Sequence, residues 1–185
     1  MVHVFGYGSL MCPDSANVTL QRPQSPDTPH AATLAGYRRV WNVVSRRRFL
    51  DDDEPTSVIV LGIEPAADVN MVGTVIALRD DDELARLDER EALYDRIDVT
   101  ALISPRFDGT VYTYLPRPEH TRVPDDAVIA RNYLDIVMRG CGLQGDAFTR
   151  RYHETTAPHN VPIRDGETER VTPAPATSNP ATPRR

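Results

Sequence analysis

The 185-residue sequence contains no lysine, so that all 21 of its basic residues are arginine. A chain without lysine cannot form a lysine Schiff base, anchor pyridoxal phosphate, or supply the lysine of a phosphate-binding P-loop. Positive charge is also short overall, because the formal net charge at pH 7 is −6. Non-specific binding to nucleic acids relies on a cationic surface. We therefore expect neither lysine-dependent chemistry nor a nucleic-acid partner.

Cysteine and long apolar runs are scarce too. Cys12 and Cys141 are too few for a disulfide framework, which indicates reduced thiols in a cytoplasmic protein. No apolar run approaches the roughly 20 residues of a membrane span, and the N-terminus lacks the pattern of a secretory signal. The five histidines show no spacing typical of a zinc site. We expect a cytoplasmic protein without a metal site or a membrane partner; the oligomeric state is left open.

The order of the expected elements favours an α+β fold. A loop is expected from Pro13 to Pro29, and the expected helices cover residues 82–93, 127–139 (stopped by Gly140 and Gly142) and 145–154. Extended patterns cover residues 2–5, 32–45, 58–63, 71–78, 96–103 and 110–114. Strands outnumber helices and do not alternate with them regularly, as they would in a doubly wound sheet.

The character of the chain changes after about Pro162. The remaining residues lack aromatic side chains and contain repeated prolines, so that they cannot bury enough apolar surface to offset the entropy of ordering. We therefore expect one domain, residues 1–162, followed by a disordered tail, residues 163–185.

A carboxylate interrupts the apolar face of the expected helix over 82–93. Leu84, Leu87, Glu91 and Tyr94 share one face at helical spacing, and Glu91 lies near its middle, whereas Arg90 points away. Burial would raise the pKa of Glu91, which suits a general acid/base near neutral pH. Spacing alone leaves a second interpretation equally open, a structural salt bridge, for example to Arg38, Arg39 or Arg96.

A glycine turn follows the first expected strand, with the sequence Gly6-Tyr7-Gly8-Ser9-Leu10. Its glycines would let backbone N–H groups converge on an anionic or carbonyl oxygen. Met11 stands where a dinucleotide-binding fingerprint and a serine nucleophile elbow each require glycine. A glycine turn with no ligand remains the alternative.

Taken together, the turn and Glu91 resemble the signatures of the γ-glutamyl cyclotransferase-like superfamily, which includes ChaC-type enzymes, γ-glutamylamine cyclotransferases and AIG2-like proteins. The resemblance covers about residues 3–155. Its motifs are Phe5–Leu10, Leu34–Arg39 with Trp41, Val72–Val75, Leu87–Glu91, and Tyr94 with Arg96. The chain lacks the glycine-glycine-tyrosine run of ChaC-type enzymes, and Ser9 replaces the threonine usual in the γ-glutamylamine type.

The resemblance implies a mixed-sheet β-barrel with flanking helices and a reaction that needs no metal or organic cofactor. The α-amine of a small-molecule γ-glutamyl substrate would attack its own γ-carbonyl and release 5-oxoproline and an amine or amino acid. Glu91 would be the catalytic acid/base. Residues Tyr7, Gly8, Ser9 and Leu10 would bind substrate, and Tyr114 is either a further cavity hydroxyl or a core residue.

Two other functions remain open on the same fold. The chain could be a non-catalytic AIG2-like binding or regulatory module, which would bind a ligand without turning it over. It could also remove a γ-glutamyl group from a biosynthetic intermediate. The identity of the amine leaving group is not encoded in any pattern that the sequence shows.

Overall fold

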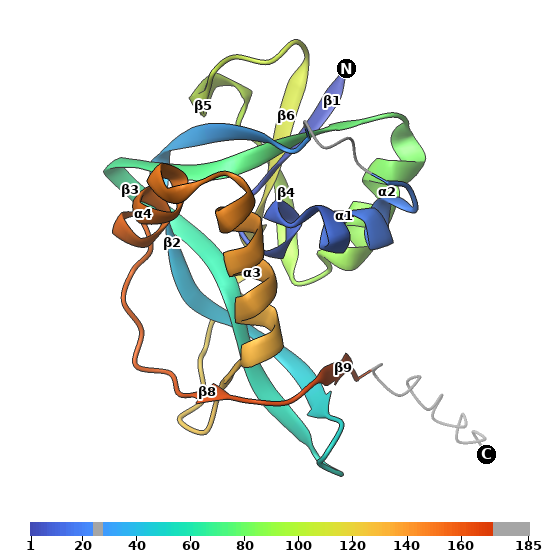
Figure 1. The fold of residues 1–185 in the computed structure, drawn as a ribbon, viewed down its shortest axis with the longest axis vertical. Helices are drawn as coiled ribbons and strands as arrows, with labels where there is room; N and C mark the ends of the chain where they lie inside the picture. Colours follow the sequence, from blue (N-terminus) through green and yellow to red (C-terminus); the bar gives the residue numbers. More distant parts are fainter. Residues whose placement is uncertain (24–27, 172–185) are drawn as a thin grey trace, which may run out of the picture.

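The computed structural model describes residues 1–23 and 28–171, which form an α+β fold built on one curled mixed sheet (Figure 1). The N-terminal half contains β1 (Val2–Gly6), a 3-10 turn η1 (Ser9–Met11), α1 (Pro13–Leu20), β2 (His30–Phe49), β3 (Pro55–Leu78) and α2 (Asp81–Arg90). The C-terminal half contains β4 (Tyr94–Asp98), β5 (Ile103–Ser104), β6 (Thr110–Pro116), β7 (Ile129–Ala130), α3 (Arg131–Leu143), α4 (Asp146–Glu154), β8 (Ile163–Arg164) and β9 (Thr168–Arg170).

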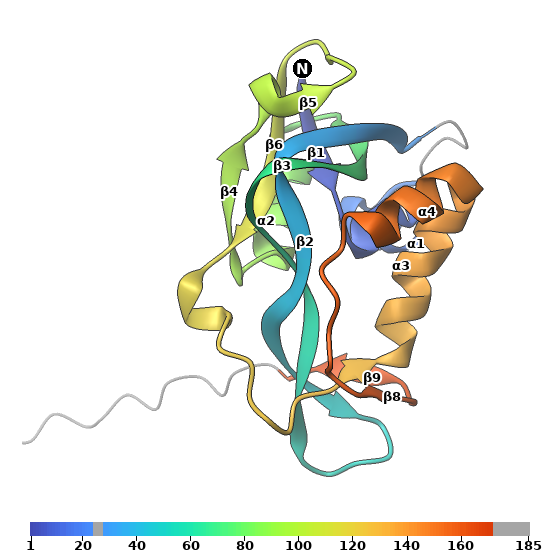
Figure 2. The same cartoon turned by 90° about the vertical axis from the view of Figure 1, so that its left-hand side faces the viewer.

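Seven strands form the main sheet, in the order β4-β6-β1-β3-β2-β5, with β9 added to β2. Only the pairing of β1 with β6 is parallel in this sheet. The long strands β2 and β3 form an antiparallel hairpin that runs the length of the molecule (Figure 2). Register shifts at 35/37 and 41/43 bend this hairpin, because a bulge increases the local twist. The sheet therefore curls into a half-barrel, and the expected α+β mixed-sheet barrel with flanking helices is confirmed.

Close approach of backbones fixes the position of β1 against β3. A Cβ atom on Gly73 would lie 2.4 Å from the ring of Phe5 and 2.6 Å from the carbonyl oxygen of Gly6. Phe5 itself is buried in the larger core cluster, beside Leu34 and Met71. Because Gly73 has no side chain, the end of β1 can pack closely against β3 at the point where the turn to η1 begins.

Several of the expected boundaries are wrong. The segment expected as one strand over 96–103 contains the end of β4, a 3-10 turn (Thr100–Leu102) and the start of β5. The segment expected as a loop from Pro13 contains helix α1, with the proline at its first position, where proline is well tolerated. The expected strands 58–63 and 71–78 belong to one continuous strand, β3. Helix α3 starts at Arg131 and continues through Gly140 to Leu143. Gly140 does not stop the helix but allows contact, since a Cβ there would lie 2.8 Å from the backbone nitrogen of Cys12.

The boundary of the expected tail also changes. Strands β8 and β9 lie within the segment 163–185, and β9 pairs with β2 at Arg47–Phe49. Packing against an existing strand edge gives this polar segment the backbone partners that its composition alone does not provide. Residues 172–185 lie outside the described residues, so the expectation of a disordered tail there stays a prediction.

Candidate active site

The turn after β1 is held in place by a buried arginine. Arg39, on β2, is fully buried and donates hydrogen bonds to the carbonyl oxygens of Tyr7 (3.1 Å), Tyr152 (3.2 Å) and Val72. Its guanidinium also lies 4.1 Å from the centre of the Tyr152 ring. Burial lowers the pKa of Arg39 to about 10, so that the group remains charged at neutral pH. A buried cation therefore fixes the backbone of the turn that follows β1.

The turn itself presents the start of a helical segment to the site. Gly8 is the N-cap of η1, and the hydrogen bond from Met11 N–H to Gly8 O (3.0 Å) closes the turn. The first N–H groups of a helical turn have no acceptor within it, which leaves those of Ser9 and Leu10 suited to an oxygen ligand. A Cβ on Gly8 would lie 3.1 Å from the hydroxyl of Tyr133, so glycine keeps the space above the turn narrow but open.

Glu91 lies at the end of α2 and not within it. The helix ends at Arg90, and Glu91 is the C-cap, with φ −93° and ψ 33° and its N–H bonded to Leu87 O at 2.9 Å. The expected apolar stripe on a helix reaching residue 93 is therefore wrong in its geometry, because the backbone turns at Glu91. Leu87 is buried, but Leu84 is only half-buried. The Glu91 carboxylate nevertheless lines a pocket, because the backbone turn at the end of α2 directs it there.

One small pocket joins the turn to Glu91. Its lining residues are Phe5, Gly6, Tyr7, Gly8, Ser9, Leu10, Leu61, Glu91, Tyr94, Tyr114 and Tyr133. All the residues expected to form the site thus line one pocket. Sequence reasoning missed Tyr133 and Leu61, since α3 and β3 are far from the turn in sequence and no local pattern brings them to it.

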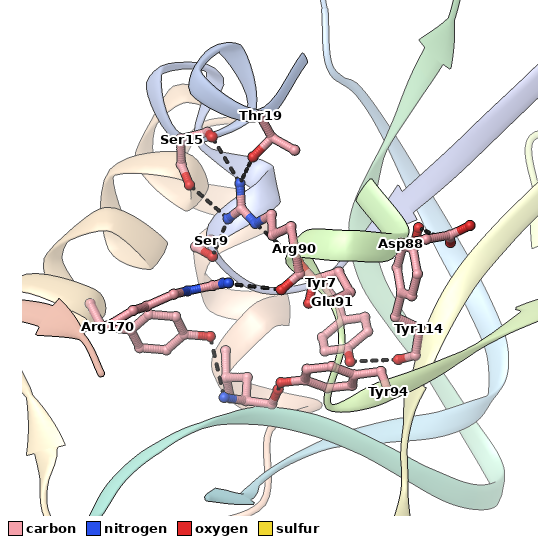
Figure 3. Close-up of polar contacts among 12 residues, drawn as sticks. Tyr7, Ser9, Ser15, Thr19, Asp88, Arg90, Glu91, Tyr94, Tyr114 and Arg170 are labelled. Carbon is pink, nitrogen blue, oxygen red and sulfur yellow. Dashed lines mark hydrogen bonds and ion pairs between the residues drawn. The ribbon is translucent and has the colours of Figure 1, made fainter. Parts of the chain in front are cut away.

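Four tyrosines surround the carboxylate, and three of them are tied to backbone groups (Figure 3). The hydroxyl of Tyr7 donates to Tyr114 O at 2.6 Å, and that of Tyr94 donates to Leu61 O at 2.8 Å. The hydroxyl of Tyr133 accepts from Leu61 N–H at 3.2 Å. Burial raises the pKa of each of these phenols, for Tyr133 to about 12. They stay neutral at physiological pH and form a fixed polar wall.

Tyr114 differs from the other three because its hydroxyl bonds a side chain and not a backbone group. It donates to Asp88 Oδ1 at 2.9 Å, and Asp88 in turn forms an ion pair with Arg96. The pocket position and the hydrogen bond together show that Tyr114 is both a lining residue and part of the packed structure. The two interpretations of Tyr114 made from the sequence, a cavity residue and a core residue, do not exclude each other.

Arg90 clamps Glu91 to the turn and to α1. Its Nε lies 3.1 Å from Glu91 Oε1, and its Nη2 donates to Ser9 Oγ at 3.0 Å. The other donors bond Ser15, through Oγ and the carbonyl oxygen at 2.9 Å each, and Thr19 Oγ1 at 2.6 Å. The expectation that Arg90 points away from the site is wrong, because it assumed a continuous helix. Ser9 meets a cation that cannot accept its proton, which argues against Ser9 as a nucleophile.

The electrostatics of Glu91 balance desolvation against three cations. Its side chain is only 17% exposed, and desolvation raises the pKa of this carboxyl above its ordinary value. The positive charges of Arg90, Arg170 and Arg47 act in the opposite direction. None of the three arginines considered from the sequence is its ion-pair partner, since Arg38 pairs with Glu64, Arg96 pairs with Asp88, and Arg39 bonds the turn. A raised pKa with a cation at hand suits a group that takes up and returns protons.

Within residues 1–23 and 28–171, no group of three or more His, Cys, Asp or Glu side chains is arranged to hold a metal ion. Across the same residues, no helix is long and apolar enough to cross a membrane.

Comparison with known proteins decides the family. The model of the family "Gamma-glutamyl cyclotransferase, AIG2-like" matches residues 4–132, which include the turn and Glu91. The chain belongs to this family. A search of curated protein sequences finds no match.

Several solved structures share the fold. A structure named gamma-glutamyl cyclotransferase has a TM-score of 0.58 and 16% sequence identity, with 90% of this chain and 94% of that chain covered. A human protein described as uncharacterized has the same TM-score and identity, with 89% and 93% covered. YkqA from Bacillus subtilis has a TM-score of 0.57 and 17% identity, with 83% of this chain and 53% of YkqA covered. At such identities these structures show that the fold is shared.

Proposed function

We propose that this member of the gamma-glutamyl cyclotransferase, AIG2-like family releases 5-oxoproline from a small γ-glutamyl compound. The observation that carries the proposal is the position of Glu91, a desolvated carboxyl in the same pocket as the N–H-bearing turn over Gly8–Leu10. Family membership and the shared fold support it further.

The groups of the pocket divide the chemistry among them. The Glu91 carboxylate takes a proton from the α-ammonium group, and the freed nitrogen attacks the γ-carbonyl carbon of the same molecule. A new carbon–nitrogen bond closes the five-membered ring, and the bond to the amine breaks. The two protons lost by the α-nitrogen reach the leaving nitrogen by way of Glu91, so that the amine departs as an ammonium ion. No other reactant is consumed.

The turn and the tyrosine wall hold the substrate in shape. The N–H groups of Ser9 and Leu10 face the developing negative charge on the γ-carbonyl oxygen. Tyr7, Tyr94 and Tyr133, fixed by their own hydrogen bonds, would keep the γ-glutamyl group folded, with its amine near its carbonyl. Because the substrate is already folded when it is bound, less conformational entropy is lost on the way to the cyclic transition state.

The test is the release of 5-oxoproline by purified protein from a panel of γ-glutamyl amino acids, γ-glutamyl amines and glutathione. Release from at least one class supports the proposal and names the leaving group. Stabilisation by these compounds without release would instead favour a binding or regulatory module. Absence of both would contradict the proposed function.

A further inference from the structure

Two arginines beside the pocket have no carboxylate partner within the described part of the chain. Arg47 lies on β2 and Arg170 on β9, and the two residues face each other as register partners. By contrast, Arg48 forms an ion pair with Glu169 one position along the same strand pair, and Arg164 forms ion pairs with Asp51 and Asp52. Two unneutralised cations side by side repel each other, and an anion between them would remove that repulsion.

Each of these two arginines makes one side-chain hydrogen bond within residues 1–23 and 28–171. Arg47 donates through Nε to Ser45 Oγ at 3.1 Å, and Arg170 donates through Nη2 to the carbonyl oxygen of Arg90 at 3.1 Å. Each guanidinium carries five N–H groups in a planar fork, so both retain free donors among the residues that the structure describes. Arg47 is half-buried, and desolvation together with the neighbouring Arg170 charge lowers its pKa.

Arg90 is closer to the carboxylate but has no capacity to spare. Its five N–H groups serve five acceptors, namely Glu91 Oε1, Ser9 Oγ, Thr19 Oγ1, and the Oγ and carbonyl oxygen of Ser15. Arg39 is buried beneath the turn and bonded to backbone. Among the cations around this pocket, Arg47 and Arg170 are therefore the ones able to take up an anionic ligand.

Their location relative to the pocket indicates which part of a substrate they would meet. Neither residue lines the pocket, yet the charge of each acts on Glu91. In Figure 3, Arg170 reaches Arg90 and Glu91 from the side opposite Tyr114, which is a pocket residue. The cyclising γ-glutamyl group has to occupy the pocket, next to Glu91 and the turn. A group attached to the leaving nitrogen that extends out of the pocket past Glu91 would then meet these two arginines.

We propose that Arg47 and Arg170 form a site for an anionic group on the leaving amine, and that the preferred substrates are γ-glutamyl compounds whose amine carries a carboxylate. This inference rests on the proposed function. Two guanidinium forks match the oxygen pair of a carboxylate. The C-terminal segment that ends in β9 thereby supplies a specificity-determining residue to a pocket otherwise built from the preceding domain.

The test compares two substrates that differ only in that charge, γ-glutamylalanine and γ-glutamylalaninamide. In the wild type, kcat/KM is expected to be about ten-fold or more higher for γ-glutamylalanine, the usual size of a charge-assisted contact. In Arg47→Gln and in Arg170→Gln that preference is expected to shrink toward equality, through a higher KM for γ-glutamylalanine. Arg46→Gln is the matched control, because Arg46 is an exposed neighbour on the same strand, and it is expected to keep the preference.

The outcomes separate this inference from the proposed function. An equal loss on both substrates would overturn it, since the two arginines would then act only on Glu91. A wild type that releases no 5-oxoproline from either compound would contradict the proposed function instead. Calorimetric binding of the same two compounds then decides: a preference for γ-glutamylalanine that Arg170→Gln removes supports the anion site, and equal binding overturns it. Thermal unfolding of each variant shows whether β9 remains docked.

Discussion

Arg90 Nε lies 3.1 Å from Glu91 Oε1, although the two residues are neighbours in sequence and would diverge on a continuous helix. The contact forms because α2 ends between them, so that Glu91 turns back while Arg90 stays anchored to α1 and Ser9. Arg90 thus connects the Glu91 carboxylate to Ser9 of the turn. It also opposes the desolvation that raises the pKa of Glu91.

The acid limb of the pH–rate profile is expected to move when Arg90 is replaced by Gln. The base has to be ionised to take up a proton, so activity falls as the pH drops through the Glu91 pKa. Removal of the Arg90 charge raises that pKa further, and the limb should shift to higher pH. Arg86→Gln is the control, because Arg86 lies on the same helix and reaches Leu20 O of α1. An unchanged limb in Arg90→Gln would contradict the account of the carboxyl.

Arg39→Gln is expected to destabilise the fold more than a surface exchange of the same type. The change leaves the carbonyl oxygens of Tyr7, Val72 and Tyr152 short of their charged donor. Loss of these buried bonds should lower the free energy of unfolding by about 2–4 kcal/mol. Arg38→Gln is the matched control, since its ion pair with Glu64 is exposed and is worth at most about 1 kcal/mol. Urea denaturation of both variants measures the difference, and equal losses would refute the role of Arg39.

Gly73→Ala is expected to disturb both stability and the turn. A Cβ there meets the Phe5 ring at 2.4 Å and Gly6 O at 2.6 Å, and overpacking of this kind costs about 1–3 kcal/mol. Gly142→Ala is the opposite case, because nothing lies within 4 Å of its Cβ position on α3. Alanine is favoured over glycine in a helix by up to about 1 kcal/mol. Melting temperatures should therefore move in opposite directions, and a fall in both would contradict this interpretation.

Tyr7→Phe tests whether the tyrosine wall is fixed by its hydrogen bonds. The variant loses the 2.6 Å bond from the Tyr7 hydroxyl to Tyr114 O and should lose about 1 kcal/mol of stability. If the hydroxyl only positions the wall, KM should rise while the pH profile keeps its shape. A displaced pH profile would show that this phenol itself titrates or transfers protons.

The sequence predicts the fold class because strand and helix signals are local and strong. Alternation marks β1, and the run Asp80–Asp82 marks the start of α2, where Asp80 Oδ1 indeed accepts from Glu83 N–H at 2.8 Å. The end of α2 is not predicted correctly, because no glycine or proline marks it in the sequence. Gly140 wrongly predicts a helix end, because its small size allows the contact with Cys12 within a helix that continues.

The site was predictable only in part for the same physical reason. Glu91 and the turn carry local patterns, whereas Tyr133 lines the pocket from α3 and Arg47 and Arg170 come near it through the pairing of β2 with β9. Arg170 lies in a segment whose composition predicts disorder, and its order depends on the backbone partners offered by β2. The amino-acid composition of a segment does not show which strand edge it will pair with.

The central claim is that Glu91 transfers protons in the cyclisation, and Glu91→Gln tests it most directly. Glutamine keeps the size and polarity of the side chain but cannot act as a base, so kcat for 5-oxoproline release should fall by about 10²–10⁴-fold. KM should change little, and the exposed neighbour exchange Glu89→Gln should keep the wild-type rate. A folded Glu91→Gln variant that releases 5-oxoproline at the wild-type kcat would contradict the account.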